Sequence, residues 1–191
     1  MNFGAAQGEW ERWSLWLGLT ADLLPVVSNP NARISSGSTL KTLGKVPSLY
    51  SATGVCGIHG WTAKQATEED VLAWAENPDY GICLQTRVVR AIDVDVEDAG
   101  ESAAIRAMLA PLGLPTRARE GSNKFLMLFR TPGEMTKRRI TTRHGVVELL
   151  ATGQQCIVSG THPSGLRYQW PDGIPVHIPE ISSSDFANVW G

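Results

Sequence analysis

The chain has 191 residues, a formal net charge of −2 and 42% hydrophobic residues, which suits a globular protein with one core, or one core and a small lobe. No apolar run is long enough to span a membrane, and the N-terminus lacks the basic start and apolar stretch of a signal peptide. Cys56, Cys83 and Cys156 form no CxxC pair, which argues against a structural zinc site and indicates a reducing compartment. We therefore expect a cytoplasmic protein.

The first half of the chain predicts two helices separated by a long loop. Residues 9–24 place their apolar side chains near helical spacing, and Pro25 ends the pattern. Residues 28–48 are rich in Ser, Asn, Gly and Pro, so we expect a loop or an extended arm there. Thr67 precedes an apolar run and predicts a helix N-cap, with Asp70 as the reciprocal acid of a capping box.

Strands dominate from residue 81 onward. Residues 81–84 and 88–96 predict two strands, and the short link between them predicts a hairpin. A helix is expected over residues 99–110, stopped by Pro111. Further strands are expected over residues 124–130, 146–150 and 155–159, the last two joined through Thr152 and Gly153. This mixed order favours an α+β fold with an antiparallel sheet.

The most informative motif is the pair Asp93 and Asp95, separated by one valine inside the apolar strand of residues 88–96. Side chains alternate along a strand, so the two acids share a face. Two like charges are costly in an apolar strand, and a hard divalent cation such as Mg²⁺ or Mn²⁺ relieves that cost. The alternative interpretation is a strand end with two solvated acids.

A third acid, Glu148, is the only charge in the apolar strand of residues 146–150. A surface position on a half-exposed strand explains it most simply. If this strand lies beside that of Asp93, however, three carboxylates converge. Three carboxylates can hold two metal ions about 3.5–4 Å apart, the arrangement of two-metal phosphoryl transfer.

Basic and polar residues offer candidate phosphate ligands, although a net charge of −2 does not favour a nucleic-acid-binding protein. Ser122 and Lys124 would share a strand face, and both donate to phosphate. His162 lies in a glycine-rich turn where its imidazole could donate to a phosphate oxygen, and Gly160 would let a ligand approach closely. Two basic stretches are either local phosphate-binding patches or solvated faces. The first contains Arg117, Arg119, Lys124 and Arg130, and the second contains Lys137, Arg138, Arg139 and Arg143.

In this order the motifs resemble the N-terminal primase–polymerase domain of phage and plasmid replication proteins, in the archaeo-eukaryotic primase superfamily. The resemblance spans roughly residues 40–171. It is carried by Asp93-Val-Asp95, Ser122-Asn-Lys124, Glu148 and Gly160-Thr-His-Pro-Ser-Gly165, with upstream similarity at Gly44-Lys-Val-Pro47, Gly57-Ile58 and Trp61-Thr62. It implies an RRM-like mixed or antiparallel sheet with helices and a smaller α/β N-terminal lobe. We divide the chain into an N-terminal helix (1–30), a catalytic domain (31–175) and an extended tail or linker to a following domain (176–191).

The resemblance also implies roles for individual residues. Asp93 and Asp95 match the family's first motif and Glu148 its third, so these three are expected to be catalytic and to bind metal. The second motif is normally Ser-x-His, and Lys124 stands here in place of the histidine that holds the nucleotide's phosphates. The residues expected to bind the nucleotide are Ser122, Lys124, His162, Arg119 and Arg117.

The implied function is that of a DNA primase and polymerase in phage or plasmid replication. It would transfer nucleotides from nucleoside triphosphates on a single-stranded DNA template, with Mg²⁺ or Mn²⁺ and with a basic surface over residues 137–143 tracking the template. A helicase domain C-terminal to this chain, a location in the bacterial host's cytoplasm and no membrane partner are also expected. Two alternatives are a metal-dependent nuclease, which uses the same acids with water as nucleophile, and a non-catalytic single-strand-binding replication module, which has no need of the three acids together.

Overall fold

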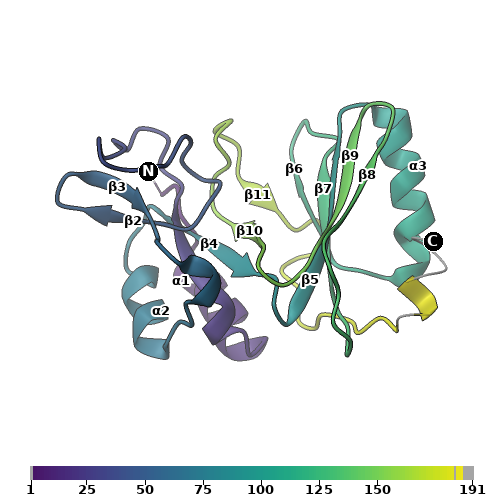
Figure 1. Ribbon diagram of the computed structural model, residues 1–191, viewed down its shortest axis with the longest axis horizontal. Coiled ribbons are helices and arrows are strands. Elements are labelled where there is room, and N and C mark those ends of the chain that lie inside the picture. Colours follow the sequence, from purple (N-terminus) through teal and green to yellow (C-terminus); the bar gives the residue numbers. More distant parts are fainter. Residues whose placement is uncertain (1, 183, 187–191) are drawn as a thin grey trace. The chain divides into compact units, whose positions relative to one another are not determined.

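The computed structural model describes residues 2–182 and 184–186, and the chain forms two compact units, each with its own sheet (Figure 1). Unit 1 comprises Met1–Gln85 and Gln155–Tyr168, and unit 2 comprises Thr86–Gln154 and Gln169–Gly191. The combination of helices with antiparallel sheets confirms the predicted α+β class. Among the described helices, none has the length and apolar character needed to cross a membrane.

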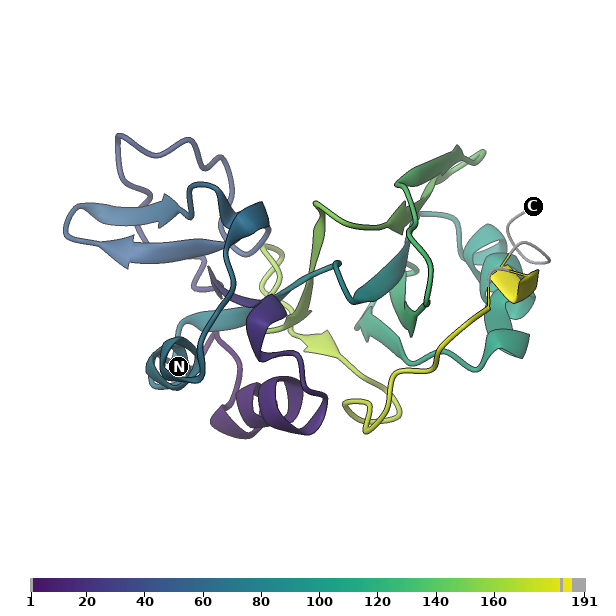
Figure 2. The same cartoon turned by 60° about the horizontal axis from the view of Figure 1, so that its bottom comes forward.

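Unit 1 is built on a three-stranded antiparallel sheet in the order β1-β4-β10. Every residue of β1 and β4 is buried, as expected of strands covered on both faces. A separate hairpin is formed by β2 and β3 (Figure 2). The strand bounds are β1 Leu23–Val27, β4 Tyr80–Gln85, β10 Gln155–Ser159, β2 Ser48–Ser51 and β3 Gly54–Gly57.

The first helical segment of unit 1 is more broken than the sequence predicts. The expected helix over residues 9–24 is divided into α1 (Gln7–Glu11), a π-helical turn η1 (Arg12–Trp16) and a 3₁₀ turn η2 (Thr20–Asp22). Pro25, expected to stop a helix, lies inside β1, which is an edge strand and so tolerates a residue without an N–H.

The second helix, α2 (Glu68–Ala75), confirms its predicted cap. The Thr67 hydroxyl accepts the Asp70 N–H at 3.1 Å, and an Asp70 carboxylate oxygen accepts the Thr67 N–H at 3.0 Å. A short 3₁₀ turn, η3 (Trp61–Ala63), precedes it.

Unit 2 is built on a six-stranded sheet in the order β11-β6-β7-β5-β9-β8. One face of this sheet packs against α3 (Ala99–Leu109), which continues as the 3₁₀ turn η4 (Ala110–Leu112) (Figure 1). The core beneath α3 contains Ile92, Val94, Phe125, Met127, Val147 and Leu149. The strand bounds are β5 Val89–Val96, β6 Thr116–Arg119, β7 Phe125–Arg130, β8 Arg138–Thr141, β9 Gly145–Leu150 and β11 Tyr168–Gln169.

The described part of the segment after residue 176 packs onto the core of unit 2. The Arg130 N–H donates to Pro179 O and the Ile181 N–H donates to Arg130 O, both at 2.8 Å. The ring of Phe186 stacks on Phe129, with 5.7 Å between ring centroids. Two buried apolar side chains, Ile181 and Phe186, thereby join the core.

The hairpin predicted between residues 81–84 and 88–96 is wrong, because β4 and β5 belong to different sheets. β9 and β10 are joined through Thr152 and Gly153, as expected, and they also belong to different sheets. At these points the chain passes between the two sheets. Thr86, at the first passage, donates its N–H to Gln154 O at 2.9 Å and its hydroxyl to Ala151 O at 2.6 Å. The short links resemble hairpin turns because the sequence of a turn does not show whether the strands on either side pair with each other.

Candidate active site

The candidate site is organised by strand register in unit 2. Asp93 on β5 lies directly opposite Glu148 on β9 and Leu126 on β7. Glu148 in turn pairs with Arg139 on β8, and Leu126 with Arg117 on β6. Paired residues of neighbouring strands project to the same face. These five residues therefore form one row across five strands, on the face opposite the core beneath α3.

A second row begins two residues along β5, at Asp95. The Lys124 ammonium lies 2.6 Å from an Asp95 carboxylate oxygen and 2.5 Å from a carboxylate oxygen of Glu97. Hydrogen bonds to Asp95 and then to Glu97 raise the pKa of Lys124 above 10.5. The interactions of Lys124 with these two acids therefore stabilise the folded protein fully below pH 10.5. This stabilisation is lost only as the pH rises through the raised pKa of Lys124. Lys124 is a fixed positive charge at neutral pH.

Glu148 is also paired with a lysine. The Lys137 ammonium lies 2.9 Å from a Glu148 carboxylate oxygen, and the Glu148 side chain is 23% exposed. The condition on which convergence of the three carboxylates depended is met, because the strand of Glu148 lies beside the strand of Asp93 and these two residues pair.

The three predicted metal ligands lie on one sheet face, but ammonium groups accompany two of them. Among the described residues, no three Asp, Glu, His or Cys side chains come close enough together to hold a metal ion. The donor set itself fits a hard divalent cation, because Asp93, Asp95 and Glu148 offer only carboxylate oxygens. In the structure, Lys124 and Lys137 neutralise the charge of Asp95 and Glu148, as a bound cation would.

The turn between β6 and β7 brings the other predicted groups of unit 2 together. The Ser122 hydroxyl oxygen accepts the Lys124 N–H at 3.3 Å and an Arg119 guanidinium N–H at 3.4 Å. Arg119 lies two residues after Arg117 on β6 and so shares its face. Gly121, with a φ of 65°, makes the tight turn possible. Ser122 lies three positions before Phe125, the first residue of β7, so the turn positions Ser122 and the strand does not.

His162 belongs to unit 1, in a turn after β10. The Ser164 backbone N–H donates to His162 Nδ1 at 3.0 Å, and the Ser164 hydroxyl lies 2.9 Å from the same nitrogen. A nitrogen that accepts a backbone N–H carries no proton, so the neutral imidazole is protonated on Nε2. Tyr168 packs edge-on against the ring, with 5.7 Å between ring centroids. The turn thus fixes an imidazole whose Nε2–H is a hydrogen-bond donor.

Gly160 does not have the role that the sequence indicated. A Cβ there would lie 2.7 Å from the Ser28 hydroxyl and 2.9 Å from the Gly81 Cα, and its φ is 118°. The small residue is therefore required by packing within unit 1, and the expectation of close ligand approach at this position is wrong.

Sequence reasoning missed Glu97 and did not assign Arg139 to a face. Glu97 follows Asp93 and Asp95 in the same acidic segment, and this continued run of acids was the signal that could have found it. The face of Arg139 depends on its pairing with Glu148, which no local pattern shows.

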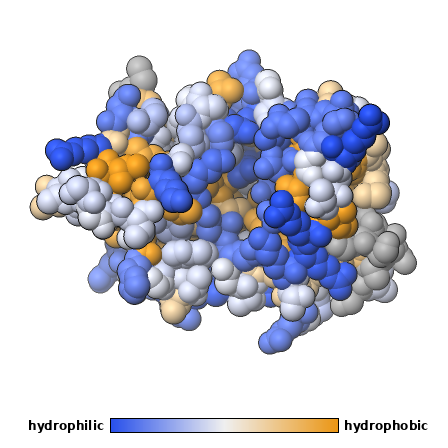
Figure 3. Space-filling model, turned by 45° about the horizontal axis from the view of Figure 1, so that its top comes forward, coloured by the Kyte–Doolittle hydropathy of each residue, from blue (hydrophilic) through white to orange (hydrophobic). Residues whose placement is uncertain are grey.

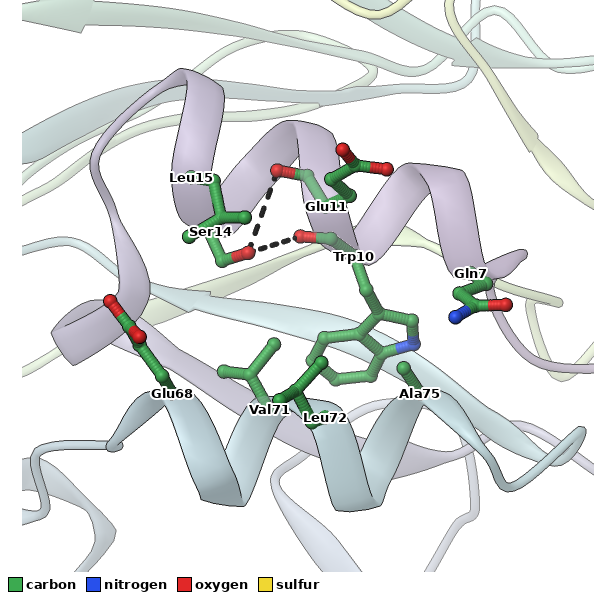
Figure 4. A pocket seen from close by; sticks show the side chains of 9 residues that line it. All are labelled: Gln7, Trp10, Glu11, Ser14, Leu15, Glu68, Val71, Leu72 and Ala75. Carbon is green, nitrogen blue, oxygen red and sulfur yellow. Dashed lines mark hydrogen bonds between the residues drawn. The ribbon is translucent and has the colours of Figure 1, made fainter.

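A pocket of about 210 Å³ between α1 and α2 of unit 1 is unsuited to phosphate (Figure 4). Trp10, Val71 and Leu72 give it apolar walls, and Glu11 and Glu68 are the charged residues that line it. In Figure 4 the Ser14 hydroxyl is bonded to the backbone oxygens of Trp10 and Glu11, so it is engaged within its own helix.

The family described as bifunctional DNA primase/polymerase, N-terminal, matches residues 19–181, a range that includes all the predicted site residues. The chain belongs to this family. Among curated proteins, none matches the sequence. As a member of the primase/polymerase (Prim-Pol) family, the chain has the general function of a nucleotidyltransferase in DNA replication, which agrees with the resemblance found in its motifs.

Proposed function

We propose that this Prim-Pol domain makes and extends primers by template-directed transfer of nucleotides from nucleoside triphosphates. The observation that carries the proposal is the sheet face on which Asp93 and Glu148 are direct neighbours, with Asp95 one row away and Arg117 and Lys124 beside them. Carboxylates for metal next to cations for phosphate are the parts that nucleotidyl transfer requires.

Asp93 and Asp95 are proposed to bind Mg²⁺ or Mn²⁺, with Glu148 completing the set. When bound, the metal ions lower the pKa of the primer's 3′-hydroxyl and stabilise the charge on the leaving pyrophosphate. A cation bound to Asp95 repels the Lys124 ammonium, which lies 2.6 Å from one oxygen of this carboxylate. An incoming triphosphate offers Lys124 a new partner, so we expect metal and nucleotide to bind cooperatively.

In the proposed reaction, the 3′-hydroxyl gives its proton to water and its oxygen forms a bond to the α-phosphorus, as the bond from that phosphorus to the bridging oxygen breaks and pyrophosphate leaves. Lys124, Arg117 and Arg119 neutralise charge on the phosphates, and Ser122 adds a hydrogen bond. His162 is proposed to donate from Nε2 to a phosphate oxygen, since Ser164 already occupies its Nδ1.

The template is proposed to run along the basic stretch that contains β8. Arg139 is the member of this stretch that the register places in the row of Asp93 and Glu148. Binding should weaken with salt, because phosphate contacts release counterions. A C-terminal helicase domain, a phage or plasmid origin and a host-cell cytoplasmic location remain part of the proposal.

The test is incorporation of labelled nucleotide on circular single-stranded DNA, with Mg²⁺ or Mn²⁺ and no added primer. We expect the parent chain to make labelled products and the Asp93→Ala/Asp95→Ala variant to make none. Degradation of the DNA without incorporation would instead establish a nuclease. Strand binding that is equally tight in EDTA, with no product even from an added primer, would establish a binding module.

A further inference from the structure

Residues 23–67 contain no aspartate or glutamate, although the whole chain has a net charge of −2. The same stretch carries four basic side chains, at Arg33, Lys41, Lys45 and Lys64. In a mildly acidic protein, such a segment concentrates positive potential and attracts anionic ligands. Neither the predicted metal ligands nor the predicted nucleotide ligands lie in it.

Part of this acid-free stretch lines an open pocket of about 600 Å³ in unit 1. Its walls come from the loop of residues 39–47 and the segment of residues 57–61. Lys41, Lys45, His59 and Trp61 line it, and none of the described residues that line it is acidic. Ammonium groups bind phosphate and an indole ring stacks on a base, so this lining suits a nucleotide.

The pocket is held in shape although its loop has no regular secondary structure. Gln155 on β10 donates from its side chain to Lys45 O at 2.9 Å, and the Ile58 N–H donates to Pro47 O at 3.1 Å. The Gly44 N–H donates to Val27 O on β1 at 2.8 Å. Backbone anchors of this kind position Lys45 and its neighbours before a ligand arrives, which reduces the entropy lost on binding.

The loop also packs on the turn that carries His162. A Cβ at Gly44 would lie 3.1 Å from Thr161 O and 3.3 Å from Pro163 Cδ, and its φ is 69°. Glycine is therefore needed here both for its backbone conformation and for the close approach. The pocket loop and the proposed phosphate donor, His162, are thus neighbours within unit 1.

We propose that this pocket binds one nucleoside unit of a single DNA strand, with the two phosphates that flank it at Lys41 and Lys45 and its base stacked on Trp61. The inference deepens the proposed function and rests on it for the identity of the strand, which is the template. A strand held here would not depend on metal, because the lining contains no carboxylate.

The experiment measures binding of a labelled single-stranded DNA of about 20 nucleotides in EDTA, by fluorescence anisotropy at several salt concentrations. Lys41→Ala/Lys45→Ala should weaken binding about tenfold or more and reduce the salt slope by about 1.4, or about 0.7 for each phosphate that is no longer neutralised. Trp61→Ala should weaken binding about tenfold, and Trp61→Phe should stay within about threefold because a ring remains. Thermal melting of each variant verifies that it is folded.

Arg33→Ala is the matched control, because Arg33 is exposed, lies in the same acid-free stretch and does not line the pocket. It should bind as the parent does. The proposal is overturned if folded Lys41→Ala/Lys45→Ala and Trp61→Ala variants bind the strand as tightly as the parent, or if Arg33→Ala loses as much as the lysine variant. It is also overturned if the pocket variants lose only the binding of free nucleoside triphosphate.

Incorporation of nucleotides, measured separately, keeps the two proposals apart. If DNA binding depends on the pocket but the chain incorporates no nucleotide, the proposed function is refuted and the pocket assignment stands. Incorporation by a chain whose pocket variants bind DNA normally would refute the pocket assignment alone.

Discussion

At the scale of single residues, Lys124 determines the charge environment of Asp95 on β5. It stands where the family's second motif has histidine, and it is held by Asp95 and Glu97 together. A lysine offers a point charge with a permanent proton, whereas a histidine offers a directed donor. The chain therefore has a fixed charge at this position of unit 2, and unit 1 separately holds an imidazole at His162 that Ser164 orients.

Substitution of the two acids that hold Lys124 separates metal binding from ion pairing. Asp95→Asn and Glu97→Gln each remove one carboxylate from Lys124, but only Asp95 is a proposed metal ligand. We expect Asp95→Asn to lower primer extension about a hundredfold or more and Glu97→Gln to change it by less than about threefold. The Asp95 side chain is 52% exposed, so the pair with Lys124 should be worth less than about 1 kcal/mol of unfolding free energy.

Extension assays and denaturant unfolding of both variants test this prediction. Equal losses of activity would show that the carboxylates act only by positioning Lys124, and the metal assignment of Asp95 would be wrong.

The same residues show what a sequence can predict at this scale. The shared face of Asp93 and Asp95 follows from strand periodicity alone, and the structure confirms it. The neighbouring position of Glu148 was stated only as a condition, because strand order within a sheet depends on contacts distant in the sequence. Glu97 was missed because it lies beyond the apolar run that marked the strand.

At the scale of elements, β8 presents its arginines to opposite faces. Arg139 pairs with Glu148 and lies on the face of the candidate site, whereas Arg138 pairs with Leu149, whose side chain lies in the core on the other face. Arg139→Ala should weaken binding of single-stranded DNA about threefold or more and reduce its salt slope by about 0.7, and Arg138→Ala should change neither. Anisotropy titrations at several salt concentrations compare the two. A larger effect from Arg138→Ala would place the template on the opposite face.

A carboxylate at the start of α3 holds the turn between β8 and β9. Glu101 accepts the backbone N–H groups of Arg143 at 3.2 Å and His144 at 3.0 Å, and its carboxylate lies 3.0 Å from His144 Nδ1. Although desolvation raises the pKa of Glu101, the hydrogen bonds from His144 and Arg143 outweigh it, and the pKa lies below 4.5. A lowered pKa stabilises the folded state above pH 4.5, and this stabilisation is lost as the pH falls through the lowered value.

Glu101→Gln should therefore lower the melting temperature at pH 7, and the difference from the parent should shrink as the solution is acidified below pH 4.5. Glu120→Gln is the control, because Glu120 is exposed in the turn before β7. Calorimetry across this pH range measures both. A deficit that stays constant with pH would show that the carboxylate charge does not hold the turn.

Helices and strands were largely predictable at this scale, and their pairing was not. The capping box of α2 and the bounds of α3 follow from local chemistry, and both are confirmed. The hairpin between residues 81–84 and 88–96 was predicted wrongly because β4 pairs with β10 instead of β5, although the segment Thr86–Gln154 of unit 2 lies between β4 and β10 in the sequence. The helix over residues 9–24 was overextended because the apolar residues at its end belong to β1, where burial on both faces removes the alternation typical of a strand.

At the scale of the whole molecule, hydrophilic side chains cover most of the face seen in Figure 3, with hydrophobic ones in small separate groups. Charge is distributed unevenly along the chain: residues 23–67 lack acids, whereas β5 and the residues after it hold Asp93, Asp95 and Glu97. The net charge of −2 hides this separation. For this reason the total charge, taken alone, argued against nucleic-acid binding.

Thr86, at the start of the segment Thr86–Gln154 of unit 2, is hydrogen-bonded to the end of that segment. Its side chain is fully buried, and its hydroxyl donates to Ala151 O at 2.6 Å. Thr86→Val removes this bond, although the Gln154 N–H still donates to Ala151 O at 3.1 Å, and should lower the free energy of unfolding by about 0.5–1.5 kcal/mol, whereas Thr86→Ser keeps the hydroxyl and should lose less. Urea denaturation ranks the two variants. A greater loss for Thr86→Ser would show that the methyl group, not the hydrogen bond, matters here.

The discontinuity of unit 1 has a consequence for synthesis on the ribosome. β4 emerges early, but its partner β10 follows only after Thr86–Gln154 has been translated, which takes several seconds at about 5–20 residues per second. During this interval the nascent chain carries a strand that is buried in the folded protein but has one open edge, the kind of edge that pairs with other chains. Translation speed and chaperone access should therefore influence how much of this protein reaches its folded state.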